Sequence, residues 1–224
     1  MRPLLALALL AACGRPLTPN ETAMAHAFLG PAIRPEAVRF HGDLAAGPSR
    51  TVPTRPRETC RERIMPPIEG PSFQSSTAAM AAFDHVWVRP SLFLEDYLAG
   101  IEEGVLNLPA AMLFLHEMVH VWQWQNRAVT GYHPLKAAFE HVRSADPYLF
   151  DPETRADLLD FGWEQQGVIV EEYLCCRTLA PEAERTSRLH AMLGVHFDLP
   201  ALSRPIAREA LLPWDGVELA GICD

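Results

Sequence analysis

The sequence predicts a mainly helical α+β protein with one small sheet, and two patterns support this expectation. Two long stretches, 110–127 and 163–174, carry apolar residues at helical spacing. Two short stretches, 38–41 and 84–89, alternate polar and apolar residues as half-buried strands do. Because stretch 110–127 is apolar nearly all round, we expect it to form the buried central helix.

The other elements are predicted from local signals. Residues 18–21 read Thr-Pro-Asn-Glu, a capped helix start with proline at the first helical position, which predicts a helix over 21–28. Residues 47–71 are proline-rich and predict a loop or interrupted strands. Helical segments are further expected at 91–97 (a single turn), 135–142, 151–161, 181–193 and 201–211.

The central helix contains the most informative motif, because residues 116–120 read His-Glu-Met-Val-His. On a helix His116 and His120 share one face and can bind one Zn²⁺, while Glu117 can take a proton from a metal-bound water. Glu117 is the one charged residue within 113–121, so this face is expected to be buried. Burying two histidines and a glutamate without a partner is costly, which favours a metal.

A catalytic zinc needs a third protein ligand and an open position. A longer form of this zinc motif has a glycine three residues and a third histidine six residues after the second histidine. That form is excluded, because Gln123 and Asn126 occupy these two positions. A carboxylate on a downstream helix is the other source, and we rank Glu164 first. Glu171 lies two turns further on the same face, as an alternative ligand or a partner of a ligating histidine. Gly167 would let the two helices approach closely.

Three other polar residues have weaker signals. Tyr132 and His133 follow the central helix and are candidates to donate a hydrogen bond to an oxyanion, although such residues more often line a loop. Glu172 points about a hundred degrees away from Glu171 around the helix, so we expect it to be solvated.

The cysteines predict a disulfide framework. Cys60, Cys175, Cys176 and Cys223 can form two bridges in an oxidising compartment. A bridge between the adjacent Cys175 and Cys176 is strained, so each is expected to bond outward, to Cys60 and Cys223 in either order. The alternative is four buried free thiols.

The first residues resemble a bacterial lipoprotein signal. Residues 1–12 contain one arginine and a short apolar run, and Leu-Ala-Ala-Cys at 10–13 fits a lipobox. This predicts cleavage before Cys13, an acyl anchor on Cys13, a tether over 13–19 and one domain over 20–224. An ordinary secretory signal is the alternative. The net charge of −9 disfavours nucleic acid as a partner.

The stretch His-Glu-Met-Val-His-Val-Trp-Gln-Trp-Gln at 116–125, together with 163–167 and 171–173, resembles bacterial Vgr-related, zinc-peptidase-like proteins. Residues 17–21 and 84–89 are similar to that group as well, whereas the lipobox and the cysteine set depart from it. The resemblance implies a zincin-like domain of the gluzincin type, in which the motif-bearing helix packs against a downstream helix that carries the glutamate ligand.

The expected function is therefore that of a lipid-anchored zinc metallopeptidase of the bacterial cell envelope, with Glu117 as general base and a peptide or protein as substrate. The alternative is a zinc-stabilised binding or assembly module without catalysis. Glu117 favours the first, because a structural site needs the two histidines but not this glutamate.

Overall fold

The computed structural model describes residues 14–45, 47–144 and 146–224. The predicted signal at 1–12 and the predicted lipidation site Cys13 lie outside the described residues. One hydrophobic core cluster includes residues from Met24 near the amino end to Cys223 near the carboxyl end. Among the described helices, none is both long enough and apolar enough to cross a membrane.

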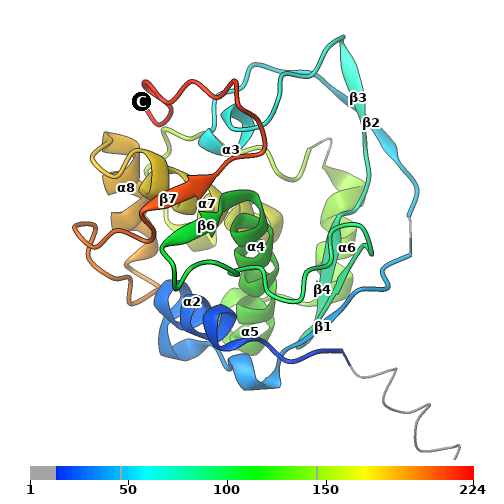
Figure 1. Cartoon of the computed structure of the whole chain (residues 1–224). Helices are drawn as coiled ribbons and strands as arrows, with labels where there is room; N and C mark the ends of the chain where they lie inside the picture. Colours follow the sequence, from blue (N-terminus) through cyan, green and yellow to red (C-terminus); the bar gives the residue numbers. More distant parts are fainter. Residues whose placement is uncertain (1–13, 46, 145) are drawn as a thin grey trace, which may run out of the picture.

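Two long helices pack against each other at the centre of the molecule (Figure 1). They are α4, Leu108–Gln125, and α7, Trp163–Leu179, so both predicted helices are confirmed and α7 extends beyond its predicted end. The Asn107 side chain caps α4 by accepting a hydrogen bond from the Ala110 N–H. Most of α4 is buried, as its apolar pattern predicts.

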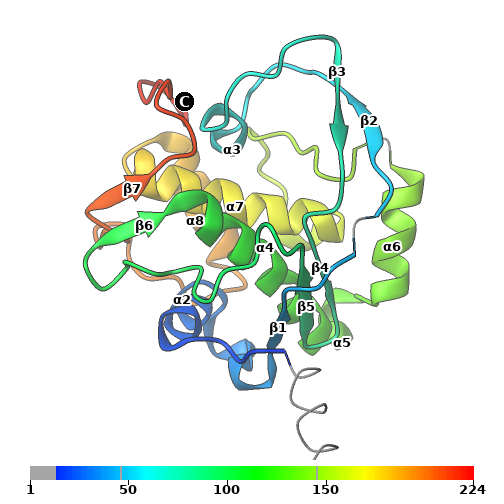
Figure 2. The ribbon, with the colours of Figure 1, turned by 45° about the vertical axis from the view of Figure 1, so that its right-hand side comes forward.

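A three-stranded sheet lies beside α4, with strand order β1-β5-β4 (Figure 2). Both predicted strands are confirmed, as β1, Arg39–His41, and β5, His85–Val88. These two run parallel, and β4, Ala79–Ala82, pairs antiparallel with β5. The residues of β4, alanine and methionine, do not alternate between polar and apolar, so the sequence did not predict this strand.

Two further strand pairs lie outside this sheet. The antiparallel pair joins β2, Arg50–Pro53, to β3, Ser72–Ser75. The proline-rich segment 47–71 is a loop that contains the short strand β2 and the four-residue helix α3, Cys60–Arg63. The parallel pair joins β6, Val105–Asn107, to β7, Glu209–Leu211, which attaches the carboxyl-terminal segment to the chain just before α4.

The shorter helices surround the central pair. Thr18 and Glu21 form the predicted capping box at the start of the first of them. They are α2 (Pro19–Leu29), α3 (Cys60–Arg63), α5 (Arg127–Thr130), α6 (Pro134–Arg143) and α8 (Glu184–Leu193), with single 3-10 turns η1 (Gly30–Ala32), η2 (Pro35–Ala37) and η3 (Leu158–Asp160).

Two of the longer predicted helices were wrong, and the segment 91–97 forms turns in place of the expected turn of helix. The segment 151–161 forms turns and the short η3, because the Asp151 and Asp157 side chains accept hydrogen bonds from nearby backbone N–H groups. The segment 201–211 forms turns followed by β7. There the Arg177 guanidinium binds two carbonyls of the segment, and Pro205 disfavours helical geometry before it.

The structure contains both expected disulfides and resolves their order. Cys60 bonds Cys175, and Cys176 bonds Cys223. All four cysteines are fully buried. The first bridge joins α3 in the proline-rich segment to α7, and the second joins α7 to the carboxyl-terminal end.

Thiol titration tests this framework. Soluble Cys13→Ser protein, denatured without reductant, should show close to zero free thiols, because each of the other four cysteines is in a bridge. The same sample after reduction is the control and should show about four. A count near four before reduction contradicts the framework.

Candidate metal centre and its surroundings

Helix α4 turns three polar side chains of the motif toward α7. His116, Glu117 and His120 are only 6%, 4% and 5% exposed, although each can ionise. The two imidazole rings meet nearly at right angles, and their Nε2 atoms lie 3.2 Å apart. Two buried ring nitrogens that face each other form a strong site for a cation.

Glu164 completes a triangle of donor atoms. This carboxylate lies in the first turn of α7, and its Oε2 is 3.2 Å from His116 Nε2 and 3.4 Å from His120 Nε2. His116, His120 and Glu164 are all buried and present ligand atoms within 4.8 Å of one another. The structure thus brings together the three side chains that the sequence ranked as metal ligands.

The amide of Gln123 holds His120 in the orientation that a metal ligand needs. His120 Nδ1 lies 2.8 Å from Gln123 Oε1, an acceptor, so this nitrogen carries a proton and, in the neutral ring, Nε2 keeps its lone pair. The Gln123 amide group in turn donates to Trp163 O and Gln166 Oε1 on α7, both at 3.0 Å. These contacts fix which end of the amide faces the ring.

Glu171 contacts the outer nitrogen of the other histidine. Its Oε1 lies 2.8 Å from His116 Nδ1, and its Oε2 lies 3.2 Å from Arg61 Nε on α3. Burial alone would raise the pKa of Glu171, but Arg61 and His116 outweigh burial and lower it, so the carboxylate is charged. Glu171 therefore occupies the position of an outer partner, the second of the two roles predicted for it.

Glu117 is a buried carboxylate with an unused acceptor. Among the described residues, Glu117 Oε2 has no hydrogen-bond partner. Burial raises the pKa of this carboxyl, whereas the neighbouring His116 and His120 lower it and Glu164 raises it further. A buried oxygen without a donor is costly, which is typical of a group that receives a proton from a bound molecule.

Two buried carboxylates of α7 also shift the pKa values of His116 and His120. Burial lowers the pKa of His116, but Glu171 and Glu164 outweigh it and raise the pKa well above its usual value. For His120, Glu164 likewise outweighs burial and raises the pKa. Two carboxylates on α7 thus stabilise positive charge on the motif face of α4.

Gly167 allows the two helices to meet at this point, as the sequence predicted. A Cβ atom on Gly167 would lie 2.8 Å from His116 Cε1 and 2.9 Å from its Nδ1, closer than real side chains approach. The imidazole of His116 therefore occupies the space that a side chain on α7 would fill.

Gly167→Ala should lower metal affinity at least about tenfold, because the added methyl group displaces the His116 ring from its donor position. Chelator competition with zinc measures this loss. Gly47→Ala is the matched control, since a Cβ there meets no atom within 4 Å. Unchanged affinity in Gly167→Ala would contradict the placement of His116.

Two tyrosines face the histidine rings. Tyr132 stacks on His120 with ring centroids 6.0 Å apart, and Tyr148 lies against His116 with centroids 6.1 Å apart. Burial, with smaller contributions from Glu164 and Glu117, raises the pKa of both phenols, so both stay protonated. Each is a hydrogen-bond donor beside the centre.

His133, the other candidate oxyanion donor, also caps a helix. Its Nδ1 accepts a hydrogen bond from the Leu135 N–H, and it is the N-cap residue of α6. Its ring also meets the edge of Trp124. The structure gives His133 a helix-capping role through Nδ1, and its role as an oxyanion donor stays a prediction.

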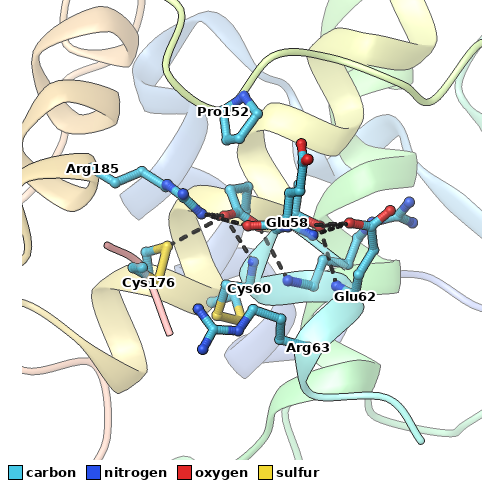
Figure 3. Close-up of polar contacts among 12 residues, drawn as sticks. Glu58, Cys60, Glu62, Arg63, Pro152, Cys176 and Arg185 are labelled. Atoms are coloured by element: carbon cyan, nitrogen blue, oxygen red, sulfur yellow. Dashed lines mark hydrogen bonds and ion pairs between the residues drawn. A yellow bond between two sulfur atoms is a disulfide. The ribbon is translucent and has the colours of Figure 1, made fainter. Parts of the chain in front are cut away.

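Glu172 corrects another expectation, because it is fully buried and not solvated. Its carboxylate accepts hydrogen bonds from the backbone N–H groups of Cys60 and Arg61, at 2.9 and 3.1 Å, and pairs with Arg185 at 3.1 Å. Figure 3 shows this network between α7, α8 and the start of α3. The sequence predicted none of these three partners, because they come from other segments of the chain.

A cavity of about 210 Å³ is lined by two side chains that contact residues of the centre. Tyr148, which contacts His116, and Arg61, which contacts Glu171, both line it. Phe150 and Val168 add an apolar wall, and Arg55 adds a second cation that is paired with Glu62.

The roles of Gln123, Tyr148 and Arg61 were missed by sequence reasoning. Gln123 had a local signal, because it lies three residues after His120 and so returns to the same face of α4. Tyr148 and Arg61 lie in irregular or short segments whose position depends on tertiary contacts, so their spacing gave no signal.

The fold and these contacts define a helical protein with a candidate His-His-Glu metal centre and an adjacent buried glutamate. The chain shares its fold with the solved effector domain of Pseudomonas aeruginosa VgrG2b, at a TM-score of 0.50 and 24% identity, over 87% of this chain and 92% of that one.

Sequence comparison gives a related protein of the same name. Over 106 residues, 46% of this chain, the sequence is 32% identical to the type VI secretion system spike protein VgrG2b of Pseudomonas aeruginosa strain PAO1. The matched part is 10% of that relative's length, so the chain corresponds to a small portion of it. No family model matches the chain.

Proposed function

We propose that this chain is a zinc-dependent metallopeptidase of the bacterial envelope, anchored by lipid at Cys13, with His116, His120 and Glu164 as metal ligands. The observation that carries the proposal is the triangle of their donor atoms, with edges of 3.2, 3.2 and 3.4 Å. Tetrahedral zinc with nitrogen and oxygen ligands at about 2.1 Å would have ligand atoms about 3.4 Å apart.

The surroundings of the triangle fit zinc as well. His120 Nδ1 has a hydrogen-bond partner in Gln123, and His116 Nδ1 lies 2.8 Å from the Glu171 carboxylate in an ion pair, so both rings can offer Nε2. Outer partners of this kind orient histidine ligands and raise their basicity. When bound, zinc would polarise the scissile carbonyl and acidify the attacking water.

The chain's own residues can supply the proton transfers and the binding of the substrate. Glu117 Oε2, which has no hydrogen-bond partner among the described residues, can accept the water proton and pass it to the leaving amine. Tyr132 and Tyr148 can donate to the developing oxyanion from beside the two imidazoles. The cavity that Tyr148 lines can receive one substrate side chain.

The second candidate function is a zinc-stabilised binding or assembly module. Glu117 favours catalysis over this alternative, because a structural site needs no buried carboxylate with an unused oxygen. The likeness to an effector domain supports a unit that acts on a target.

Metal analysis and a broad peptide-cleavage screen of soluble Cys13→Ser protein test the proposal. We expect about one zinc per chain and cleavage that chelation abolishes and added zinc restores. Zinc binding without cleavage of any peptide would favour the binding module, and absence of zinc would reject both.

Palmitate labelling tests the anchor. The wild-type protein should take up label and Cys13→Ala should not, because the Leu-Ala-Ala-Cys sequence at 10–13 fits a lipobox. A wild-type protein without label removes the lipoprotein part of the proposal and leaves the metal centre untouched.

A further inference from the structure

Helix α3 lies on α7 through a covalent bond and two backbone contacts. The Cys60–Cys175 disulfide joins their side chains. The Glu172 carboxylate accepts the N–H groups of Cys60 and Arg61, the first residues of α3 (Figure 3). A helix of four residues does not hold its position by its own hydrogen bonds, so α3 depends on these attachments.

The residue after Cys60 leads directly to the metal centre. Arg61 Nε lies 3.2 Å from Glu171 Oε2, and Glu171 Oε1 lies 2.8 Å from His116 Nδ1. The side chains of Arg61 and Glu171 therefore link the disulfide-bonded helix α3 to His116, whose Nε2 is one donor of the triangle. Arg61 touches none of the donor atoms in these contacts, so any effect it has on the centre acts through Glu171.

We propose that Arg61 is a positioning residue for the metal centre and that the Cys60–Cys175 disulfide holds it in place, so that full metal affinity requires the oxidised protein. This inference rests on the metal centre of the proposed function. The disulfide fixes α3 on α7, Arg61 then fixes the Glu171 carboxylate, and Glu171 fixes the ring of His116.

The redox step is a thiol–disulfide exchange. In the reduced chain, the thiol of one of the two cysteines, Cys60 or Cys175, attacks an external disulfide, R–S–S–R, and forms a mixed disulfide. The thiol of the other cysteine then attacks this mixed disulfide. The S–S bond between the two cysteines forms, the bond of the external disulfide breaks, and its two sulfurs leave as R–SH with the two protons. Because thiols stay reduced in a bacterial cytoplasm, the chain would gain its full affinity only after export.

The two disulfides offer a matched pair of variants in the Cys13→Ser full chain. Cys60→Ser/Cys175→Ser cuts the covalent bond of α3 to α7, whereas Cys176→Ser/Cys223→Ser keeps that bond and frees the carboxyl-terminal end, whose carbonyls Arg63 of α3 binds. Zinc affinity, measured by competition with a chromophoric chelator, should fall about ten- to a hundredfold in the first variant and less than about threefold in the second. If both variants lose zinc affinity equally, the loss reflects the general stability of the fold, and the inference is overturned.

Arg61 gives a second test that keeps both disulfides. Arg61→Ala should lower zinc affinity about tenfold, and Arg61→Lys should recover part of the loss by keeping a cation near Glu171. Arg63→Ala is the control, since Arg63 lies on the same helix but binds carbonyls of Ala220 and Gly221. Wild-type affinity in Arg61→Ala overturns the inference even if Cys60→Ser/Cys175→Ser fails to fold.

The two proposals fail in different ways. If the wild-type chain binds no zinc tightly, the proposed function fails and this inference fails with it. If the wild-type chain binds zinc and the Arg61 and Cys60/Cys175 variants bind it equally well, only this inference fails.

Discussion

Glu117→Gln protein should bind zinc nearly as tightly as the wild type and lose peptide cleavage by about a thousandfold or more. Glu117 belongs to the motif face of α4, but it is not among the three side chains whose donor atoms converge. Its buried Oε2 has no partner among the described residues, so its acceptor is available to a bound water. The amide of glutamine has nearly the same shape and cannot take up the proton.

Rates with the best peptide from the screen and zinc stoichiometry on the same preparations measure the two effects separately. Glu102→Gln, an exposed position before α4, is the matched control and should keep both. Glu117→Gln protein that cuts peptides as fast as the wild type would assign the cleavage to a contaminant, and the binding-module function would replace the peptidase.

The centre was predictable to the extent that helical spacing determines it. His116, Glu117 and His120 follow from the periodicity of α4, and the roles of Glu164 and Gly167 follow from the start of α7, because each helix has one buried face. The outward bonding of Cys175 and Cys176 followed from their adjacency, while their partners were determined by tertiary position.

The features that were predicted wrongly depend on contacts between distant segments, which residue spacing does not encode. Glu172 lies on the side of α7 that a regular helix would expose, yet α3 and α8 cover that side and turn it into a buried ion pair with Arg185. Segment 201–211 has a helical pattern, but its carbonyls bind Arg177 and its end pairs with β6. In both cases tertiary contacts override the local preference.

Glu164→Ala and Glu171→Ala should separate a ligand from its outer partner. Glu164 Oε2 faces both imidazole Nε2 atoms, so its loss removes one of three donors and should lower zinc affinity by more than about a hundredfold. Glu171 touches only the far nitrogen of His116, so its loss should cost about ten- to a hundredfold. His116→Ala and His120→Ala should each abolish tight binding, because each removes a nitrogen donor.

Competition with chelators of graded affinity measures the zinc affinity of all four variants on one scale. Glu→Gln substitutions at positions 164 and 171 then show whether the charge or the shape of each side chain matters for zinc binding. The Glu171→Gln side chain keeps an oxygen near His116 Nδ1 and should recover part of the loss, whereas Glu164→Gln lacks the anionic donor and should not. If Glu171→Ala loses zinc while Glu164→Ala keeps it, the ligand lies two helical turns further along α7, and the donor triangle seen in the structure is not the metal site.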